Sequence, residues 1–264
     1  MLMRPAGAIA ALVFVLSGLT GVAGQAPARA MTRLAGKPNM TGVWQSLSEA
    51  HWDIQDHVSK AGPYFQLGAA FAAPPGQGIV EGNEIPYLPA AAAQKKEHAA
   101  AWLTMDPEIK CYLPGVPRAT YMPYPFQIVQ TEKDILIAYA FASANRLISM
   151  QRRQEALVDS WLGTSNGTWE GDTLVVDVTG MNGQTWFDRA GNFASENLHV
   201  IERYTMMGPN HISYEATIED PTVFSRPWKI SLPLYRRIER NVQLLDFKCV
   251  EFAEELLYGH LRKK

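Results

Sequence analysis

The second half of the chain consists of short β-branched and aromatic runs that are joined by brief turns. From residue 126 onward the runs are FQIVQT, ILIAYAFA, RLISMQ, NGTW, TLVVDVTG, LHVIERYTMM, HISYEATIED, WKISLPLYRR and VQLLDFKCV. Runs of this kind with turn residues between them indicate hairpins of neighbouring strands. About ten such strands are more than a flat open sheet usually carries without curling or closing. The sequence therefore predicts a mainly β fold, an antiparallel up-and-down barrel or a strongly curled sheet.

One strand shows which residues such a barrel would bury. In HISYEATIED polar residues alternate with an apolar set, which is Ile212, Tyr214, Ala216 and Ile218. Because successive side chains of a strand point to opposite faces, the strand has one buried and one exposed face. This pattern suits a barrel wall. The meander is expected to fill residues 126–264 and to end in a helix within EFAEELLYGHLRKK.

Residues 31–125 carry weaker signals and are expected to pack with the meander as one domain. A short strand is predicted at residues 41–46, and a helix at residues 52–60, followed by a long ordered connection. The alanine-rich run PAAAAQKKEHAAAWLTM predicts a second helix that begins at Pro89. Residues 106–125 contain five prolines, so we expect an ordered, proline-rich strap over a surface.

The first residues have the layout of a secretory signal peptide, assigned to residues 1–30. Arg4 precedes an apolar run, and small residues offer cleavage after Gly24 or after Ala30. The run is short for a membrane span, which needs roughly 20 residues, and the alternative is an uncleaved anchor. We therefore expect a periplasmic or secreted protein without integral membrane association.

Export would place Cys111 and Cys249 in an oxidising compartment, where thiols tend to pair. Two cysteines are too few for a structural zinc site, and these are not spaced as a redox pair. The sequence thus predicts a disulfide that joins the middle of the chain to its last strand. The alternative is two separate buried thiols.

Charge and motifs argue against several classes of partner. With 24 basic and 26 acidic residues and no run of one sign, nucleic acid and anionic membranes are not expected partners. No glycine-rich phosphate loop or nucleophile elbow is evident, so no cofactor is expected. His51, Asp53 and His57 carry ligand atoms but match no metal motif, and we expect a polar helix face there rather than a metal site.

Two resemblances are evident: a weak one over three residues of the first predicted strand, and a stronger one over most of the chain after the predicted signal peptide. Gly42-Val43-Trp44 resembles the G-x-W that opens the barrel of lipocalins and other calycins, which supports the barrel, although the later T-D-Y motif is not evident. The runs DPEIKCYLPGVPRATYMPYPFQIVQ, GTWEGDTLVVDVTGMNGQTWFDRAG and LHVIERY resemble a large group of exported, uncharacterised bacterial proteins that share WEGDTLVVD. That group typically has histidine where this chain has Thr164 and Ala194, and the resemblance implies export but no activity.

A long connection at residues 181–197 separates two of the predicted strands. Loops of this length in a compact domain are often lids or binding elements. Asp188 and Arg189 are candidate contacts for one polar ligand, and Trp186 offers a stacking face. The alternative is local structure, in which Asp188 caps a turn and Arg189 pairs with it or with Glu196.

The strand after that loop carries three further candidates. Its alternation places His199 and Arg203 on one face and Glu202 on the other. His199 and Arg203 are candidates to line a polar lumen or rim. Glu202, among apolar neighbours, is a candidate general acid or base. The alternative for Glu202 is a structural pair with an arginine on an adjacent strand.

These candidates lead to two hypotheses of function. The first is an exported protein that binds a small, largely apolar or aromatic molecule in the barrel mouth, where Tyr121, Tyr124 and Trp169 supply further aromatic surface. The second is a cofactor-free acid/base enzyme, an isomerase, lyase or hydrolase. Asp188, His199 or Glu202 would transfer the proton, and Arg189 or Arg203 would stabilise developing negative charge.

Overall fold

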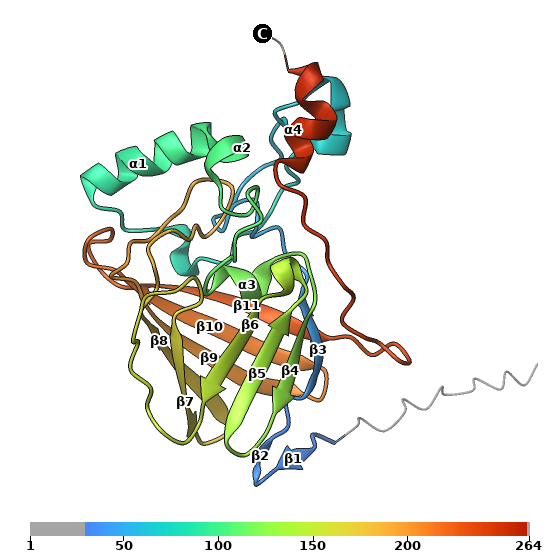
Figure 1. Ribbon diagram of the computed structural model, residues 1–264, viewed down its shortest axis with the longest axis vertical. Coiled ribbons are helices and arrows are strands. Elements are labelled where there is room, and N and C mark those ends of the chain that lie inside the picture. Colours follow the sequence, from blue (N-terminus) through green and yellow to red (C-terminus); the bar gives the residue numbers. More distant parts are fainter. Residues whose placement is uncertain (1–29, 263–264) are drawn as a thin grey trace, which may run out of the picture.

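Nine strands form a closed β-barrel in the computed structural model, which describes residues 30–262. Around the barrel the strands follow the order β10, β11, β3, β4, β5, β6, β7, β8 and β9 (Figure 1). Their bounds are β3 Gly42–Ser46, β4 Phe126–Gln130, β5 Asp134–Tyr139, β6 Asn145–Ser149, β7 Thr164–Glu170, β8 Thr173–Thr179, β9 His199–Gly208, β10 His211–Glu219 and β11 Trp228–Arg236. The predicted calycin-like barrel is confirmed. The predicted signal peptide lies outside the described residues, apart from its last residue.

One pair of neighbours departs from the antiparallel course. Strands β6 and β7 run parallel and meet in only two register pairs, Ile148 with Ser165 and Ser149 with Asn166. Parallel neighbours need a connection that returns to the starting end of the first strand. Residues 150–163 make that return here, and they contain no strand or helix. The barrel wall is therefore joined weakly between β6 and β7.

The barrel interior is filled by the inward side chains of its own strands. On β10 the predicted apolar set is completely buried, namely Ile212, Tyr214, Ala216 and Ile218. Trp44 of β3 and Phe126 of β4 are also fully buried and belong to the same continuous core. Each large apolar side chain removed from water contributes about 1.5–3 kcal/mol, so the alternation seen in the sequence accounts for much of the fold.

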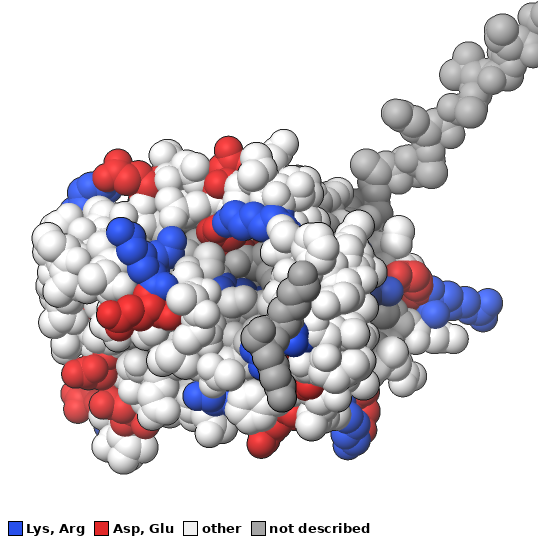
Figure 2. All heavy atoms as spheres, turned by 90° about the horizontal axis from the view of Figure 1, so that it is seen from above, with Lys and Arg blue, Asp and Glu red and all other residues white. Residues whose placement is uncertain are grey.

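The segments outside the barrel gather mainly over one of its ends, called here the capped end (Figure 1). Figure 2 looks onto this end and shows a hollowed face on which basic and acidic residues are mixed. The elements are η1 Phe65–Phe71, η2 Glu81–Asn83, α1 Pro89–Ala100, α2 Trp102–Met105, α3 Arg118–Tyr121, η3 Phe141–Ser143, α4 Ala253–Tyr258 and η4 Gly259–Leu261. The small hairpin of β1 Arg33–Leu34 and β2 Lys37–Pro38 lies at the opposite end. Within residues 30–262, no helix is long and apolar enough to span a bilayer.

The helices beginning at Pro89 and within the C-terminal tail are confirmed, but the predicted helix at residues 52–60 is wrong. Backbone groups there bond to distant partners instead of to one another. His57 bridges to Gly76 and Lys60 to Ala73, and the amide of Ile54 donates to the Asp188 carboxylate at 2.9 Å. A backbone amide has one proton to donate, so these long-range bonds exclude the helical ladder.

The predicted strand at residues 242–250 is also wrong, since this stretch is irregular. The barrel already closes through the pairing of β11 with β3, for example Leu234 with Ser46. A closed barrel leaves no edge to which another strand could add. Residues 237–262, called here the C-terminal tail, instead return to the capped end (Figure 1).

The proline-rich strap, residues 106–125, is held by buried charges. Arg118 is almost completely buried and donates to both oxygens of Asp106, at 2.7 and 2.9 Å, and to Glu108 at 2.6 Å. Such paired and hydrogen-bonded charges are the form in which ions are tolerated inside proteins. The strap is therefore an internal layer at the capped end, and not a covering laid over the outside.

The predicted disulfide is confirmed. Cys111 of the strap bonds to Cys249 of the C-terminal tail, with an S–S distance of 2.01 Å and a sequence separation of 138 residues. The bond joins the strap to an irregular segment and not to a last strand. It thereby fixes the path of a tail that has little regular structure of its own.

Replacing both cysteines, Cys111→Ser with Cys249→Ser, is expected to lower the free energy of unfolding. The chain-entropy model gives roughly 5 kcal/mol for a loop of this size, and about 2–5 kcal/mol is typical when such bonds are removed. Urea unfolding of the oxidised wild type and the double variant measures the difference. An unchanged unfolding midpoint would contradict a stabilising role for the bond.

Candidate functional site

The candidate residues on β9 point to opposite sides of the barrel wall, as their alternation predicts. Glu202 faces inward and is completely buried, whereas His199 and Arg203 lie on the outer face and are partly exposed. The expectation that His199 and Arg203 line a polar lumen is wrong, because the even-numbered residues of this strand take the inner positions. Glu202 and His199 therefore cannot act in one cavity.

Glu202 is the centre of a buried polar cluster inside the barrel. Both of its oxygens accept hydrogen bonds from the guanidinium of Arg146, with 3.1 Å between Arg146 Nη1 and Glu202 Oε1. The hydroxyls of Tyr204 and Tyr214 donate to the same Oε1 at 3.0 and 2.8 Å. Arg146 lies on β6, which is separated from β9 by β7 and β8 around the wall, so the pair joins non-adjacent strands. These four hydrogen bonds satisfy the carboxylate and leave it no contact with solvent.

The outer-face candidates take part in surface ion pairs. His199 lies between two carboxylates, with Nδ1 3.0 Å from Glu219 and Nε2 3.2 Å from Asp177. Arg203 pairs with Glu170 at 2.9 Å. Exposed pairs of this kind contribute little stability, in general about 0–1 kcal/mol.

Trp169 of β7 lies on the inner face of the wall, opposite Leu174 of β8, and packs partly buried against the core. The ammonium of Lys37, from the hairpin at the end opposite the capped end, lies 5.9 Å from the Trp169 ring centroid. Trp169 does not join the aromatic groups of the capped end. Its predicted role in one ligand pocket with Tyr121 and Tyr124 is therefore not supported by its position.

The long loop, residues 181–197, is irregular as predicted but contacts other protein segments. The Trp186 ring stacks on His98 of α1 at 4.4 Å between centroids. Gly191 has a φ of +82°, and a Cβ at this position would lie 2.5 Å from the Ala99 amide nitrogen and 2.6 Å from the Lys95 carbonyl oxygen. Only glycine permits this approach, which brings the loop directly against helix α1.

The two charged candidates of the loop are satisfied by protein groups. Asp188 is completely buried and accepts hydrogen bonds from the Ile54 amide at 2.9 Å, and from the amide and side chain of Asn192 at 3.1 and 2.6 Å. Arg189 pairs with Glu108 at 2.8 Å and with Glu254 at 3.3 Å. The local alternative is thus right for Asp188, which caps a turn, whereas Arg189 pairs with distant residues.

Burial together with the charge of nearby Asp53 raises the pKa of Asp188 to about 7, although its three hydrogen-bond donors act in the opposite direction. The desolvated carboxylate is unfavourable, so the protonated form is stabilised in the folded protein. This proton has no route to a ligand, because the side chain is enclosed. It makes Asp188 a determinant of stability and not a catalytic group.

The two aromatic candidates of the strap are divided between core and surface. Tyr121 is completely buried, and its hydroxyl donates to the carbonyl of Phe187 at 2.8 Å. Tyr124 is partly buried and packs between Phe141 and Phe247. Tyr124 and Arg189 do share a cavity, but its volume of about 190 Å³ is below the range of typical ligand pockets.

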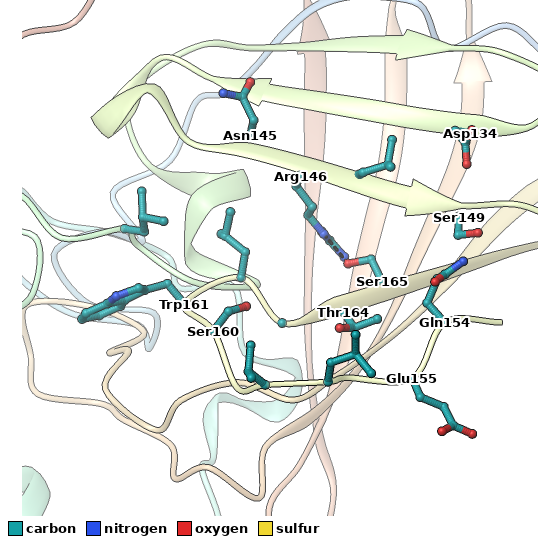
Figure 3. A pocket seen from close by; sticks show the side chains of 16 residues that line it. Asp134, Asn145, Arg146, Ser149, Gln154, Glu155, Ser160, Trp161, Thr164 and Ser165 are labelled. Carbon is teal, nitrogen blue, oxygen red and sulfur yellow. Dashed lines mark hydrogen bonds between the residues drawn. The ribbon is translucent and has the colours of Figure 1, made fainter. Parts of the chain in front are cut away.

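A larger concavity lies on the side of the barrel, where the wall between β6 and β7 is weakly joined. We call it the side groove; its volume is about 730 Å³. It lies between the outer face of β6, the start of β7 and the connecting residues 150–163 (Figure 3). Its apolar lining consists of Leu113, Leu147, Leu157, Val158, Trp161 and Leu162.

The base of the side groove is connected to the buried cluster inside the barrel. Figure 3 shows Arg146 reaching from β6 towards Ser165 on β7, and its Nε donates to the Ser165 hydroxyl at 2.8 Å. The other guanidinium nitrogens of Arg146 are bonded to Glu202, so Arg146 is held in place at the base of the groove. Its positive charge is already paired and cannot neutralise a bound anion. The hydroxyls of Ser160 and Thr164 lie along the same groove.

None of the predicted site residues lines the side groove. Its formation depends on the parallel register of β6 and β7, which hydrophobic alternation does not reveal. Two signals in the sequence do fall there. Residues 163–165 belong to the GTSNGTWEGD run, and Leu157 and Val158 are apolar residues close behind the polar run QRRQE.

His51, Asp53 and His57, whose side chains carry ligand atoms, do not form a cluster with one another. No group of three or more His, Cys, Asp or Glu suited to a metal ion occurs within residues 30–262. Asp53 accepts a hydrogen bond from the ammonium of Lys60 at 3.1 Å, and the Nδ1 of His57 lies 3.2 Å from the carbonyl oxygen of Val58.

The Glu202 cluster gives a first prediction about this region. Glu202→Gln leaves Arg146 as an unpaired buried charge and is expected to cost about 3–5 kcal/mol of stability. The double variant Arg146→Met with Glu202→Gln removes both charges and keeps an oxygen for the tyrosine hydroxyls, so it is expected to lose less than Glu202→Gln alone. Urea unfolding measures both variants; equal or greater loss in the double variant would contradict this account.

The raised pKa of Asp188 leads us to expect that the free energy of unfolding depends on pH. An aspartate in an unfolded chain has a pKa of about 3.9, so between that pH and about 7 the folded protein binds more protons. Stability from this group is fully present below pH 4 and is lost as the pH rises through 7, with a slope of at most about 1.4 kcal/mol per pH unit. Asp53→Asn removes the neighbouring charge, lowers the pKa of Asp188 and is expected to flatten the slope.

Urea unfolding at several values from pH 5 to pH 8 tests this dependence. Asp56→Asn is the matched control, since Asp56 is exposed and does not contribute to the pKa of Asp188. A slope that is unchanged in Asp53→Asn, or flattened equally in both variants, would show that another group is responsible.

Comparison with known proteins identifies no family for this chain. No family model matches the chain, and no curated protein is significantly similar to it. Because one fold can carry many functions, the function has to be argued from the chemistry of the sites themselves.

Proposed function

We propose that this is an exported protein that binds a small, largely apolar or aromatic molecule in the side groove. The barrel mouth, the location expected from the sequence, has no room for it, since the interior is filled by buried side chains such as Trp44 and Phe126. The buried strap also occupies one end of the barrel. The observation that carries the proposal is the apolar concavity of about 730 Å³, which is within the usual range of ligand pockets.

The apolar lining of the side groove is unusually exposed. Leu157 is 94% exposed, Val158 is 78% exposed and Leu147 is 60% exposed. A ligand that covers these side chains would remove apolar surface from water at about 25 cal/mol per Å², which favours binding. The aromatic face of Trp161, which also contacts Tyr112, suits a flat molecule.

The charges of the side groove favour a neutral ligand over an anion. Asp134 and Glu155 are the acidic residues in the lining, and the only cation is Arg146, which is already paired with Glu202. The hydroxyls of Ser160 and Thr164 can donate or accept hydrogen bonds, and would orient a polar end of the ligand. The proposed ligand is therefore apolar over most of its surface, with one or two neutral polar atoms.

Export is part of the same proposal. It is supported by the layout of the first 30 residues and by the disulfide between Cys111 and Cys249, which is compatible with an oxidising compartment. A binding protein for apolar molecules outside the cytoplasm would hold its ligand in solution.

The alternative, an acid/base enzyme, receives no support from the geometry. Such a mechanism requires its proton-transfer groups within hydrogen-bond reach of one cavity. Asp188 lies in the capped end, Glu202 inside the barrel and His199 on the outer wall, each with its own protein partners.

Binding of the neutral apolar dye Nile red tests the proposal. The dye is expected to gain fluorescence on binding, and Leu147→Glu, which places a charge in the lining beside two acidic residues, is expected to weaken binding at least fivefold. Met207→Glu is the control, because Met207 is also an exposed apolar strand residue, 70% exposed, but lies on β9. Equal dye affinity for wild type and Leu147→Glu, with both variants folded, would refute the side groove as the site.

A further inference from the structure

A second concavity lies at the capped end, beside helices α1 and α2 (Figure 1). We call it the upper cleft; its volume is about 400 Å³, and its main lining residues are Trp52, His57, Lys60, Lys95, Trp102 and Arg189. The lining comes from residues 52–63, helices α1 and α2, and the long loop. The upper cleft and the side groove have no lining residue in common.

The aromatic walls of the upper cleft are held in place by a cation. Trp52 and Trp102 contact each other edge to face, with 5.7 Å between ring centroids. The guanidinium of Arg189 lies 4.5 Å from the Trp52 centroid and 5.0 Å from the Trp102 centroid. Because Arg189 is itself fixed by Glu108, the two indole rings are pre-organised.

The charge of the upper cleft is opposite to that of the side groove. Its lining contains three cations and a single carboxylate, that of Asp53. Lys60 pairs with Asp53 at 3.1 Å, and Arg189 pairs with Glu108 and Glu254. Lys95 is half-buried in the cleft and has no acidic partner among the described residues. One lysine ammonium in an aromatic-walled cleft thus remains available to an anion.

We propose that the upper cleft binds a small aromatic carboxylate. The carboxylate would accept hydrogen bonds from the ammonium of Lys95, and its ring would pack against Trp52 and Trp102. A charge-assisted hydrogen bond of this type is stronger than a neutral one, and the partly enclosed position reduces screening by solvent. The volume of about 400 Å³ suits a molecule with one aromatic ring.

Benzoate is a suitable probe, and benzamide is its neutral counterpart of nearly the same shape. Titration of the protein, followed by the indole N–H signals of Trp52 and Trp102 in NMR spectra, is expected to show saturable shifts with benzoate. Replacing each tryptophan by phenylalanine assigns the two signals. Benzamide is expected to bind at least tenfold more weakly, because it cannot satisfy Lys95.

Lys95→Gln is expected to weaken benzoate binding at least fivefold, whereas Lys96→Gln leaves it unchanged. Lys96 is the matched control because it is the next residue of α1 and is exposed outside the cleft. Lysine and glutamine have similar helix propensities, so neither change disturbs the helix. Equal binding by wild type and Lys95→Gln, equal binding of benzamide, or absence of saturable shifts would each overturn the proposal.

The two proposed sites can be tested separately. Leu147→Glu is expected to leave benzoate binding unchanged, since Leu147 belongs to the side groove alone. Loss of benzoate binding in Leu147→Glu, with the fold intact, would count against an independent upper cleft.

Discussion

A single carboxylate, that of Glu108, joins three segments that are distant in sequence. It accepts hydrogen bonds from Arg118 within the strap and from Arg189 of the long loop, and Arg189 also reaches Glu254 in the C-terminal tail. Burial alone would raise the pKa of Glu108, but Arg189 and Arg118 hold it at about 2. The carboxylate therefore stays ionised over the whole physiological range. Removing one member of such a buried network usually costs several kcal/mol, because its partners are left uncompensated.

The capped end depends on this network more than on regular structure. Its helices are short, and the strap and tail are irregular along most of their length. The network sets the position of Arg189, and Arg189 in turn orients Trp52 and Trp102. The barrel below supplies a rigid apolar base, while ion pairs decide how the outer segments lie on it.

The barrel could be predicted from the sequence because its strands carry their pattern locally. Alternation separated Glu202 from His199 and Arg203 on β9, and this separation is confirmed, whereas the suggestion that His199 and Arg203 face the lumen was wrong. Features that depend on distant partners could not be predicted in this way. The backbone of residues 52–60 bonds to residues 73 and 76 and to Asp188, which no local pattern reveals. The side groove likewise arises from a parallel pairing of β6 with β7, whereas hairpin patterns predict antiparallel neighbours.

The short pairing of β6 with β7 also has a consequence for motion. Every other neighbouring pair in the barrel shares at least three register positions, whereas this pair shares two. Local opening of a protein begins where the fewest contacts must be broken. The wall would part first along this line, which is also the floor of the side groove. Transient separation of β6 from β7 would then also open the side groove to a ligand. The strength of the ion pair between Arg146 and Glu202 would limit this separation.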